Sequence, residues 1–208
     1  MFLVLITHFT LSTNAQFVRG IGIMGGVTFA KHKFEFKNPD AIEKKKFVFG
    51  FNGELFGEFG RGEYIRWQSE FQYNQKGSKD KTDSTTYKNK LAYVCWNNYL
   101  KIRYELFGGI PYLLIGPRIE YKLSEAMQSP TVVSSFKNFQ FSPSFGAGWE
   151  FVTYSNIKPI VEVHYNPDMY LNAYKTTPLD IKNRAWEIRV GLKYLLGNAS
   201  EDCPPVYR

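Results

Sequence analysis

The sequence predicts an all-β fold, an eight-stranded antiparallel up-and-down transmembrane β-barrel in an outer membrane. Apolar residues recur at every second position in segments of roughly ten residues, the length and period of a membrane-crossing strand with one apolar face. The connections between these segments are long and short in turn. This layout is typical of barrels that have short turns at one membrane surface and long loops at the other.

Eight segments carry the alternation, and each is expected to form one strand. Their apolar faces span residues 21–29, 47–59, 65–73, 94–104, 113–121, 139–151, 161–165 and 186–196. In the first segment Ile21, Ile23 and Phe29 share one face, while Gly22 and Thr28 lie on the other. Charged residues of the later segments fall on the second face. We therefore expect one face of every strand in lipid and the other in the barrel lumen.

The expected connections span residues 30–46, 60–63, 76–90, 105–110, 123–138, 152–158 and 167–183. The first, third, fifth and seventh are the long ones, which places the long loops together at one end and both chain termini at the other. In Gram-negative outer membranes the short turns are periplasmic and the long loops are extracellular. We therefore expect an outer-membrane location with both termini in the periplasm.

Residues 1–15 form the expected signal peptide. An apolar run over residues 2–11 leads into small residues, and the cleavage site is placed after Ala15. The barrel is then expected over residues 16–196, followed by a periplasmic tail over residues 197–208. The mature chain is thus expected outside the cytoplasm.

Composition excludes several other classes of protein. Aromatic residues make up 17% of the 208 residues and charged residues 22%, which is too rich in apolar side chains for an intrinsically disordered chain. After the first dozen residues, no stretch approaches the ~18 apolar residues of a transmembrane helix. Cys95 and Cys203 lie far apart without ligating neighbours. Neither a disulfide framework nor a metal site is predicted, and no cofactor is expected.

A soluble barrel of the lipocalin type would show the same alternation, with the apolar face turned inward around a ligand. Long strands, four long connections on one side and aromatic residues near the strand ends favour a barrel in lipid instead. One aromatic girdle is expected at Phe29, Phe47, Tyr73, Tyr121, Phe139 and Tyr165, and the other at Phe17, Phe59, Tyr104, Trp149, Phe151 and Tyr194.

Seven acidic and seven basic side chains fall on the inward face of this register. Because eight strands leave a lumen barely wider than its own side chains, these groups are expected to pair across it rather than line a channel. A proton or ion pathway is the alternative. The residues are Glu54, Glu58, Arg66, Glu70, Lys101, Arg103, Arg118, Glu120, Lys122, Glu150, Glu162, Glu187, Arg189 and Lys193.

The formal net charge of +7 then lies outside the lumen, chiefly on lysines of the connections 30–46 and 76–90. Basic loops of this kind would attract lipopolysaccharide phosphates or an acidic protein partner. A solvated loop without a partner is the alternative. Nucleic acid is not expected as a partner at a cell exterior.

Residues 64–77 contain Glu70, Tyr73, Lys76 and Gly77 at a spacing that resembles the E-x-x-Y-x-x-K-G stretch of the PorT-like outer-membrane β-barrel family of Bacteroidetes. This resemblance implies an eight-stranded barrel and, from the family's namesake, an accessory role in a secretion system of the outer membrane. A second resemblance is local. Arg189, Gly191, Tyr194 and Leu196 are similar to the signal by which the barrel assembly machinery recognises a last strand, which implies that machinery as a partner during insertion.

We therefore expect a structural or assembly protein, or a secretion accessory, that works through its long loops and is not an enzyme. A small pore is one alternative. A lipid-modifying enzyme, the other, would need His164 with Glu162 and a loop serine, whereas the simpler interpretation is an inward His164 bonded to a neighbouring acid. No catalytic residue is predicted, and Cys95 is expected to face the lumen.

Overall fold

The computed structural model describes residues 17–36, 47–82, 85–106, 108–126, 138–167, 174–176 and 179–196. Within these ranges, only the backbone course is described at residues 31–36, 78–82, 85–89, 174–176 and 179–183. The expected signal peptide and the expected tail, with Cys203, lie outside the described residues. No helix in the described part of the chain is long and apolar enough to span a membrane.

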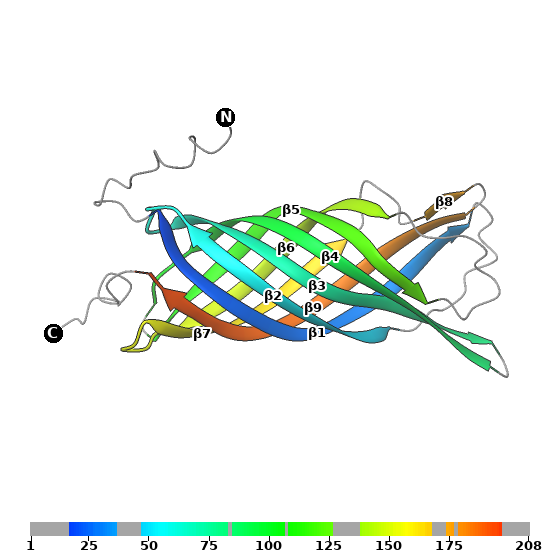
Figure 1. The fold of residues 1–208 in the computed structure, drawn as a ribbon, viewed down its shortest axis with the longest axis horizontal. Coiled ribbons are helices and arrows are strands. Elements are labelled where there is room, and N and C mark those ends of the chain that lie inside the picture. Colours follow the sequence, from blue (N-terminus) through cyan, green and yellow to red (C-terminus); the bar gives the residue numbers. More distant parts are fainter. Residues whose placement is uncertain are drawn as a thin grey trace, which may run out of the picture.

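The described chain forms antiparallel strands throughout. They are β1 (Val18–Phe36), β2 (Val48–Phe59), β3 (Ile65–Thr82), β4 (Thr85–Arg103), β5 (Gly109–Ala126), β6 (Phe139–Phe151), β7 (Ile157–Pro167), β8 (Tyr174–Thr176) and β9 (Leu179–Leu195). Each long strand pairs with the next, and β1 pairs with β9, which closes the barrel (Figure 1). The short β8 pairs only with the beginning of β9. The predicted eight-stranded barrel is confirmed, and its closure gives every wall strand a paired strand on both sides.

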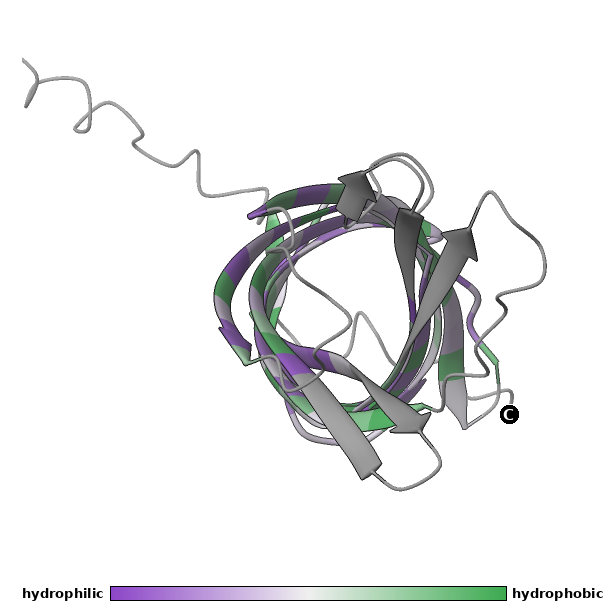
Figure 2. Ribbon diagram, turned by 90° about the vertical axis from the view of Figure 1, so that its right-hand side faces the viewer, coloured by the Kyte–Doolittle hydropathy of each residue, from purple (hydrophilic) through white to green (hydrophobic). Residues whose placement is uncertain are grey.

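The two faces of each strand have opposite environments. On β2, Phe49 and Phe51 point outward and are 67% and 70% exposed, whereas Glu54 and Glu58 point inward and are buried. Figure 2 shows hydrophilic and hydrophobic residues alternating along the strands of the ring. The apolar face is therefore outside, which excludes the lipocalin-type arrangement.

Several strands are longer than the alternation predicts. The expected connection 76–90 is mostly a hairpin, because β3 and β4 stay paired as far as Thr82 and Thr85. Likewise β1 runs to Phe36 beside β9, and β5 runs to Ala126 (Figure 1). Beyond a membrane neither face of a strand needs to be apolar, so alternation gives no signal there while the backbone ladder continues.

The two ends of the barrel differ in their connections. At the end where β1 begins and β9 ends, called the terminal end below, the turns are short. Gly60 and Gly108 in these turns have φ values of 109° and 89°, a conformation that favours glycine. At the opposite end, called the loop end, β3, β4, β1 and β9 carry the extensions.

Candidate functional site

All fourteen charged residues expected in the lumen lie on the inward face of the strands. Thirteen of them are buried, and the side chain of Lys122, near the loop end, is 8% exposed. Eleven of them fall into two groups at different depths, while Arg103 contacts Glu105, Glu120 contacts Lys76 and Arg118, and Lys122 contacts Glu125. Each group is held by strands from several walls of the barrel.

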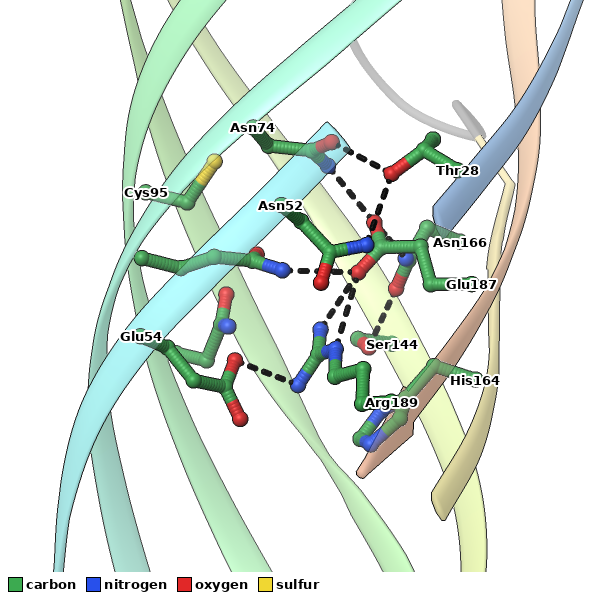
Figure 3. Close-up of polar contacts among 12 residues, drawn as sticks. Thr28, Asn52, Glu54, Asn74, Cys95, Ser144, His164, Asn166, Glu187 and Arg189 are labelled. Atoms are coloured by element: carbon green, nitrogen blue, oxygen red, sulfur yellow. Dashed lines mark hydrogen bonds and ion pairs between the residues drawn. The ribbon is translucent and has the colours of Figure 1, made fainter. Parts of the chain in front are cut away.

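The middle of the lumen holds a network that we call the central cluster: Glu54, Glu70, Arg118, Glu162, Glu187 and Arg189, from five strands. Arg189 on β9 is at its centre. Its Nη1 atom lies 2.7 Å from Glu54 Oε2, and its Nη2 atom lies 2.5 Å from Glu187 Oε2 (Figure 3). The same Nη1 atom lies 3.0 Å from Glu70 Oε2. One guanidinium thus joins three carboxylates from three strands, a task that suits its fork of five N–H donors.

Glu187 links the central cluster to polar side chains nearer the loop end. Its carboxylate accepts hydrogen bonds from the amides of Gln72, Asn74 and Asn166 at 2.7–2.8 Å. Arg118 Nη1 approaches it at 3.2 Å from β5, on the other side of the lumen. Because donors of both charged and neutral kinds surround Glu187, its buried charge is well compensated.

His164 is inward and bonded to an acid, as its simpler interpretation expects. Its Nε2 donates to Glu162 Oε2 at 2.6 Å, and Tyr112 donates to the other oxygen of this carboxylate at 2.6 Å. Ser144 is the nearby serine, and it lies on β6 rather than in a loop. Its hydroxyl is hydrogen-bonded to Tyr99 at 2.7 Å and to the side chain of Asn166, and no hydrogen bond to His164 occurs among the described side chains. These groups are all buried.

A second group, the terminal cluster, lies near the terminal end: Glu58, Arg66, Lys101, Glu150 and Lys193. Glu58 is its centre, with Arg66 Nη1 and Lys101 Nζ each 2.6 Å from its oxygens. Lys193 lies 3.4 Å from Glu58 and 2.5 Å from Glu150. The terminal cluster thus surrounds a carboxylate with cations, the reverse of the central cluster.

A layer of mostly apolar side chains separates the two clusters. Phe56 lies between Glu54 and Glu58 on β2, and it contacts Met24 and Ile160. A second group, Tyr99, Tyr112 and Leu114, packs at the opposite side of the lumen. Hydrophobic side chains therefore occupy the lumen at this depth.

Two buried lysines were missed by the sequence analysis. Lys76, expected in a connection, lies inside the barrel, and its Nζ is 2.7 Å and 2.8 Å from the two oxygens of Glu120. Lys158, also expected in a connection, donates to the carbonyl of Thr153 at 2.6 Å. Lys76 occupies the next inward position of β3 after Gln72 and Asn74. The sequence pattern did not place it in the lumen, because it did not show that β3 extends this far.

Glu70, Glu162 and His164 have ligand atoms within 4.8 Å of one another and could hold a metal ion by that measure. The surroundings of these three side chains do not fit a bound metal ion. Arg189 Nη1 already lies 3.0 Å from Glu70 and 3.9 Å from Glu162, and His164 is engaged with Glu162. A cation at this place would have to displace the guanidinium that compensates these carboxylates.

The candidate assembly signal is split between the faces of β9. Arg189 belongs to the central cluster, while Tyr194 is 47% exposed on the outer face. Leu196 directly follows β9, and its N–H donates to the carbonyl of Arg19 at 2.9 Å. Cys95 is buried, with its sulfur 3.1 Å from Arg118 Nη2.

A family model for the outer membrane protein beta-barrel domain matches residues 1–194 of the chain. The chain belongs to this outer membrane beta-barrel family. Two crystal structures of outer membrane proteins have a similar fold. OprG of Pseudomonas aeruginosa has 10% identity and a TM-score of 0.60, over 88% of this chain and 98% of OprG. Neisserial surface protein A has 14% identity and a TM-score of 0.52, over 87% of this chain and 100% of that protein.

At these identities the likeness concerns the fold alone. No curated protein matches the chain. Membership of the outer membrane beta-barrel family places the exposed apolar face in the lipid of a Gram-negative outer membrane. The exposed aromatic residues then form two girdles, with Phe47 and Tyr121 towards the loop end and Tyr104 and Phe151 towards the terminal end.

Proposed function

We propose that this outer-membrane barrel has no open channel and serves as a structural or assembly partner, or as an accessory of secretion, through its loop end. In this proposal the loop end faces the cell exterior and both termini are periplasmic. The secretion part rests on the resemblance of residues 64–77 to the PorT-like family. The lysines of the loop-end connections are the contact groups for lipopolysaccharide or for an acidic protein.

The filled lumen is the observation that carries this proposal. Gln68 on β3 reaches Glu162 on β7, four strands away, at 3.4 Å, so side chains of opposite walls touch. Between the two charged clusters lies the layer with Phe56 and Leu114. An ion would have to leave water, cross this layer and break ion pairs, which is costly in a low-dielectric lumen.

The extended strands support a role for the loop end. The pairing of β3 with β2 stops at Asn74, whereas β3 continues beside β4 to Thr82. Among the described residues, the part of β3 from Ser78 to Thr82 therefore has a ladder partner on one side only, in β4. An open strand edge with free N–H and C=O groups is a template for an added strand from a partner.

The enzyme alternative has less support in the geometry. A hydrolase of this kind needs a serine whose hydroxyl is bonded to a histidine and reachable by a lipid. Ser144 is buried inside the barrel and bonded to Tyr99 and Asn166. We therefore propose a protein without catalytic residues.

Conductance tests the first part of the proposal. In planar lipid bilayers, the purified barrel should show no stable conductance of porin size, because the lumen is filled. Gel electrophoresis verifies that the protein is folded, because a folded barrel changes its migration on boiling. A steady large conductance from such folded protein would favour the pore alternative and overturn this proposal.

A shortened hairpin tests the second part. Replacing residues 78–89 by an Asn-Gly turn should leave the barrel folded, because Gly77 and Lys90 are paired and a two-residue turn can join them. In the native membrane this variant should lose protein partners that cross-link to the intact barrel. Unchanged cross-linked products would contradict a partner site on this hairpin.

A further inference from the structure

A row of small and polar residues crosses the lipid-facing surface over five strands. The strand register places Gly57 beside Ser69 and Ser69 beside Asn98, and it places Pro117 beside Pro143. We call these five residues the polar row. It runs between two rows of bulky side chains: Leu55, Phe71, Trp96, Ile119 and Phe141 on the side of the loop end, and Phe59, Trp67, Leu100, Ile115 and Phe145 on the side of the terminal end.

Asn98 lies near the middle of the membrane. On β4 it is four residues from Val94, which pairs with Tyr73 and Tyr121 of the girdle at the loop end. In the other direction it is four residues from Ile102, next to the opposite girdle. At about 3.3 Å per residue, each distance is on the order of 13 Å along the strand. Lipid at this depth offers only hydrocarbon, without hydrogen-bonding groups.

The side chain of Asn98 keeps a donor without a partner. Ser69 donates to Asn98 Oδ1 at 3.1 Å, and Trp96 Nε1 donates to the hydroxyl of Ser69 at 3.1 Å. No hydrogen bond of Asn98 Nδ2 occurs among the described residues. If Oδ1 and Nδ2 of the amide are exchanged, the oxygen takes the unpaired position instead. In either orientation one polar atom of the amide is left without a hydrogen-bond partner.

The backbone of Asn98 lacks a donor as well. The pairing of β4 with β5 is interrupted between Asn97 beside Arg118 and Leu100 beside Ile115. Pro117 stands opposite Asn98 in this register. It has no N–H, so the carbonyl of Asn98 loses its ladder hydrogen bond. This carbonyl lies against the backbone of Gly116 on β5, inside the barrel wall, so the group that Asn98 leaves open towards lipid is its side-chain amide.

We propose that two copies of this chain associate in the membrane through the polar row, with Asn98 at the two-fold axis. A second copy is the partner that fits, because its Asn98 side chain brings both an amide donor and an amide oxygen with a second lone pair, so the two amides can bond each other reciprocally. Lipid acyl chains offer neither a hydrogen-bond donor nor an acceptor. An unpaired amide group in hydrocarbon is costly, so the contact is favourable when both groups are paired.

The shape of the surface agrees with this partner. Gly57 and Ser69 line a hollow of about 630 Å³ on the outer surface, with Phe59 and Phe71 among its walls. A row of bulky side chains from a second copy would fit into the shallow polar row. Close contact at small residues with polar groups between them is the pattern of stable association between membrane-spanning segments.

Energy transfer between labelled copies in phosphatidylcholine liposomes tests the proposal. A dye can be attached at Cys203, because Cys95 is buried. Transfer between donor- and acceptor-labelled chains should rise with the protein-to-lipid ratio. Asn98→Leu should weaken association about tenfold, the effect of two hydrogen bonds of the size found in membranes. Ser69→Trp, which fills the row and leaves Asn98 in place, should also weaken it.

Val190→Leu is the matched control, because Val190 lies outward on β9 away from the polar row. Its association should equal that of the unchanged chain. A change of gel mobility on boiling verifies that each variant folds. Two results would overturn the proposal: an unchanged chain that stays monomeric at every protein-to-lipid ratio, or a folded Asn98→Leu variant that associates as tightly as the unchanged chain.

Discussion

The two charged clusters of the lumen are built in opposite ways. In the central cluster, Arg189 is surrounded by carboxylates, with Glu54 and Glu187 within 2.7 Å of its guanidinium. In the terminal cluster, Glu58 is surrounded by cations, with Arg66 and Lys101 each at 2.6 Å. Each cluster is therefore centred on a residue of its minority charge. The net charge of the whole lumen does not reveal this arrangement, because the excess of carboxylates in one cluster and of cations in the other is local.

Position makes the two clusters unequal. The central cluster lies between the apolar layer and the polar side chains around Asn74, so its charges are far from water. The terminal cluster lies close to the barrel end, where the long stems of Lys101 and Lys193 allow their charges to move towards solvent. The carboxylate side chains of the central cluster are shorter, so they are less able to move their charges towards solvent. Loss of the central residue should therefore cost more stability.

Arg189→Met is expected to have the largest effect. It removes the one cation paired with Glu54 among the described residues, which also joins Glu70 to Glu187. An uncompensated buried charge costs about 3–5 kcal/mol, so the free energy of unfolding should fall by roughly that amount. Denaturant unfolding in detergent micelles, followed by gel mobility without boiling, measures it. A variant as stable as the unchanged barrel would mean that Glu54 has another cation.

Glu58→Gln should have a smaller effect. It leaves three basic side chains together, but Lys193 keeps its contact with Glu150 at 2.5 Å. We expect a loss of about 1–3 kcal/mol, the cost of an unsatisfied buried group that can partly relax. The same unfolding measurement compares the two variants directly. A loss larger than that of Arg189→Met would show that depth in the barrel does not set the order.

Much of this site is predictable from the sequence, and the reason is the period of two. Once a strand is recognised, alternation assigns each residue to the lumen or to lipid, and the inward positions of Glu70 and Arg189 follow. The partners with which these residues pair do not follow from the sequence. Arg189 meets Glu70 across 119 positions of sequence, because the tilt and stagger of the closed barrel bring β9 and β3 to one depth. Local alternation contains no information on that stagger.

The polar row was overlooked for a different reason. Ser69 and Asn98 interrupt the apolar faces of β3 and β4, and a single polar residue in an alternating pattern looks like ordinary variation. Only the register shows that these residues and Gly57 are neighbours on adjacent strands. Similarly, Lys76 was assigned to a loop because β3 has no apolar face beyond the membrane to mark its continuation.

Changes at two lysines near the loop end should have effects no larger than that of Glu58→Gln. Lys76 and Lys122 both face the lumen and both contact a carboxylate, at 2.7 Å from Glu120 and 2.5 Å from Glu125. They differ in burial: the first pair is 1% and 0% exposed, the second 8% and 17%. Lys76→Met should therefore cost about 1–3 kcal/mol, because it leaves a buried carboxylate with fewer donors. Lys122→Met should cost less than about 1 kcal/mol, because water can replace the lost partner of Glu125. Equal losses from the two variants, measured by the same unfolding assay, would show that distance to the carboxylate rather than burial sets the stability of lumen ion pairs.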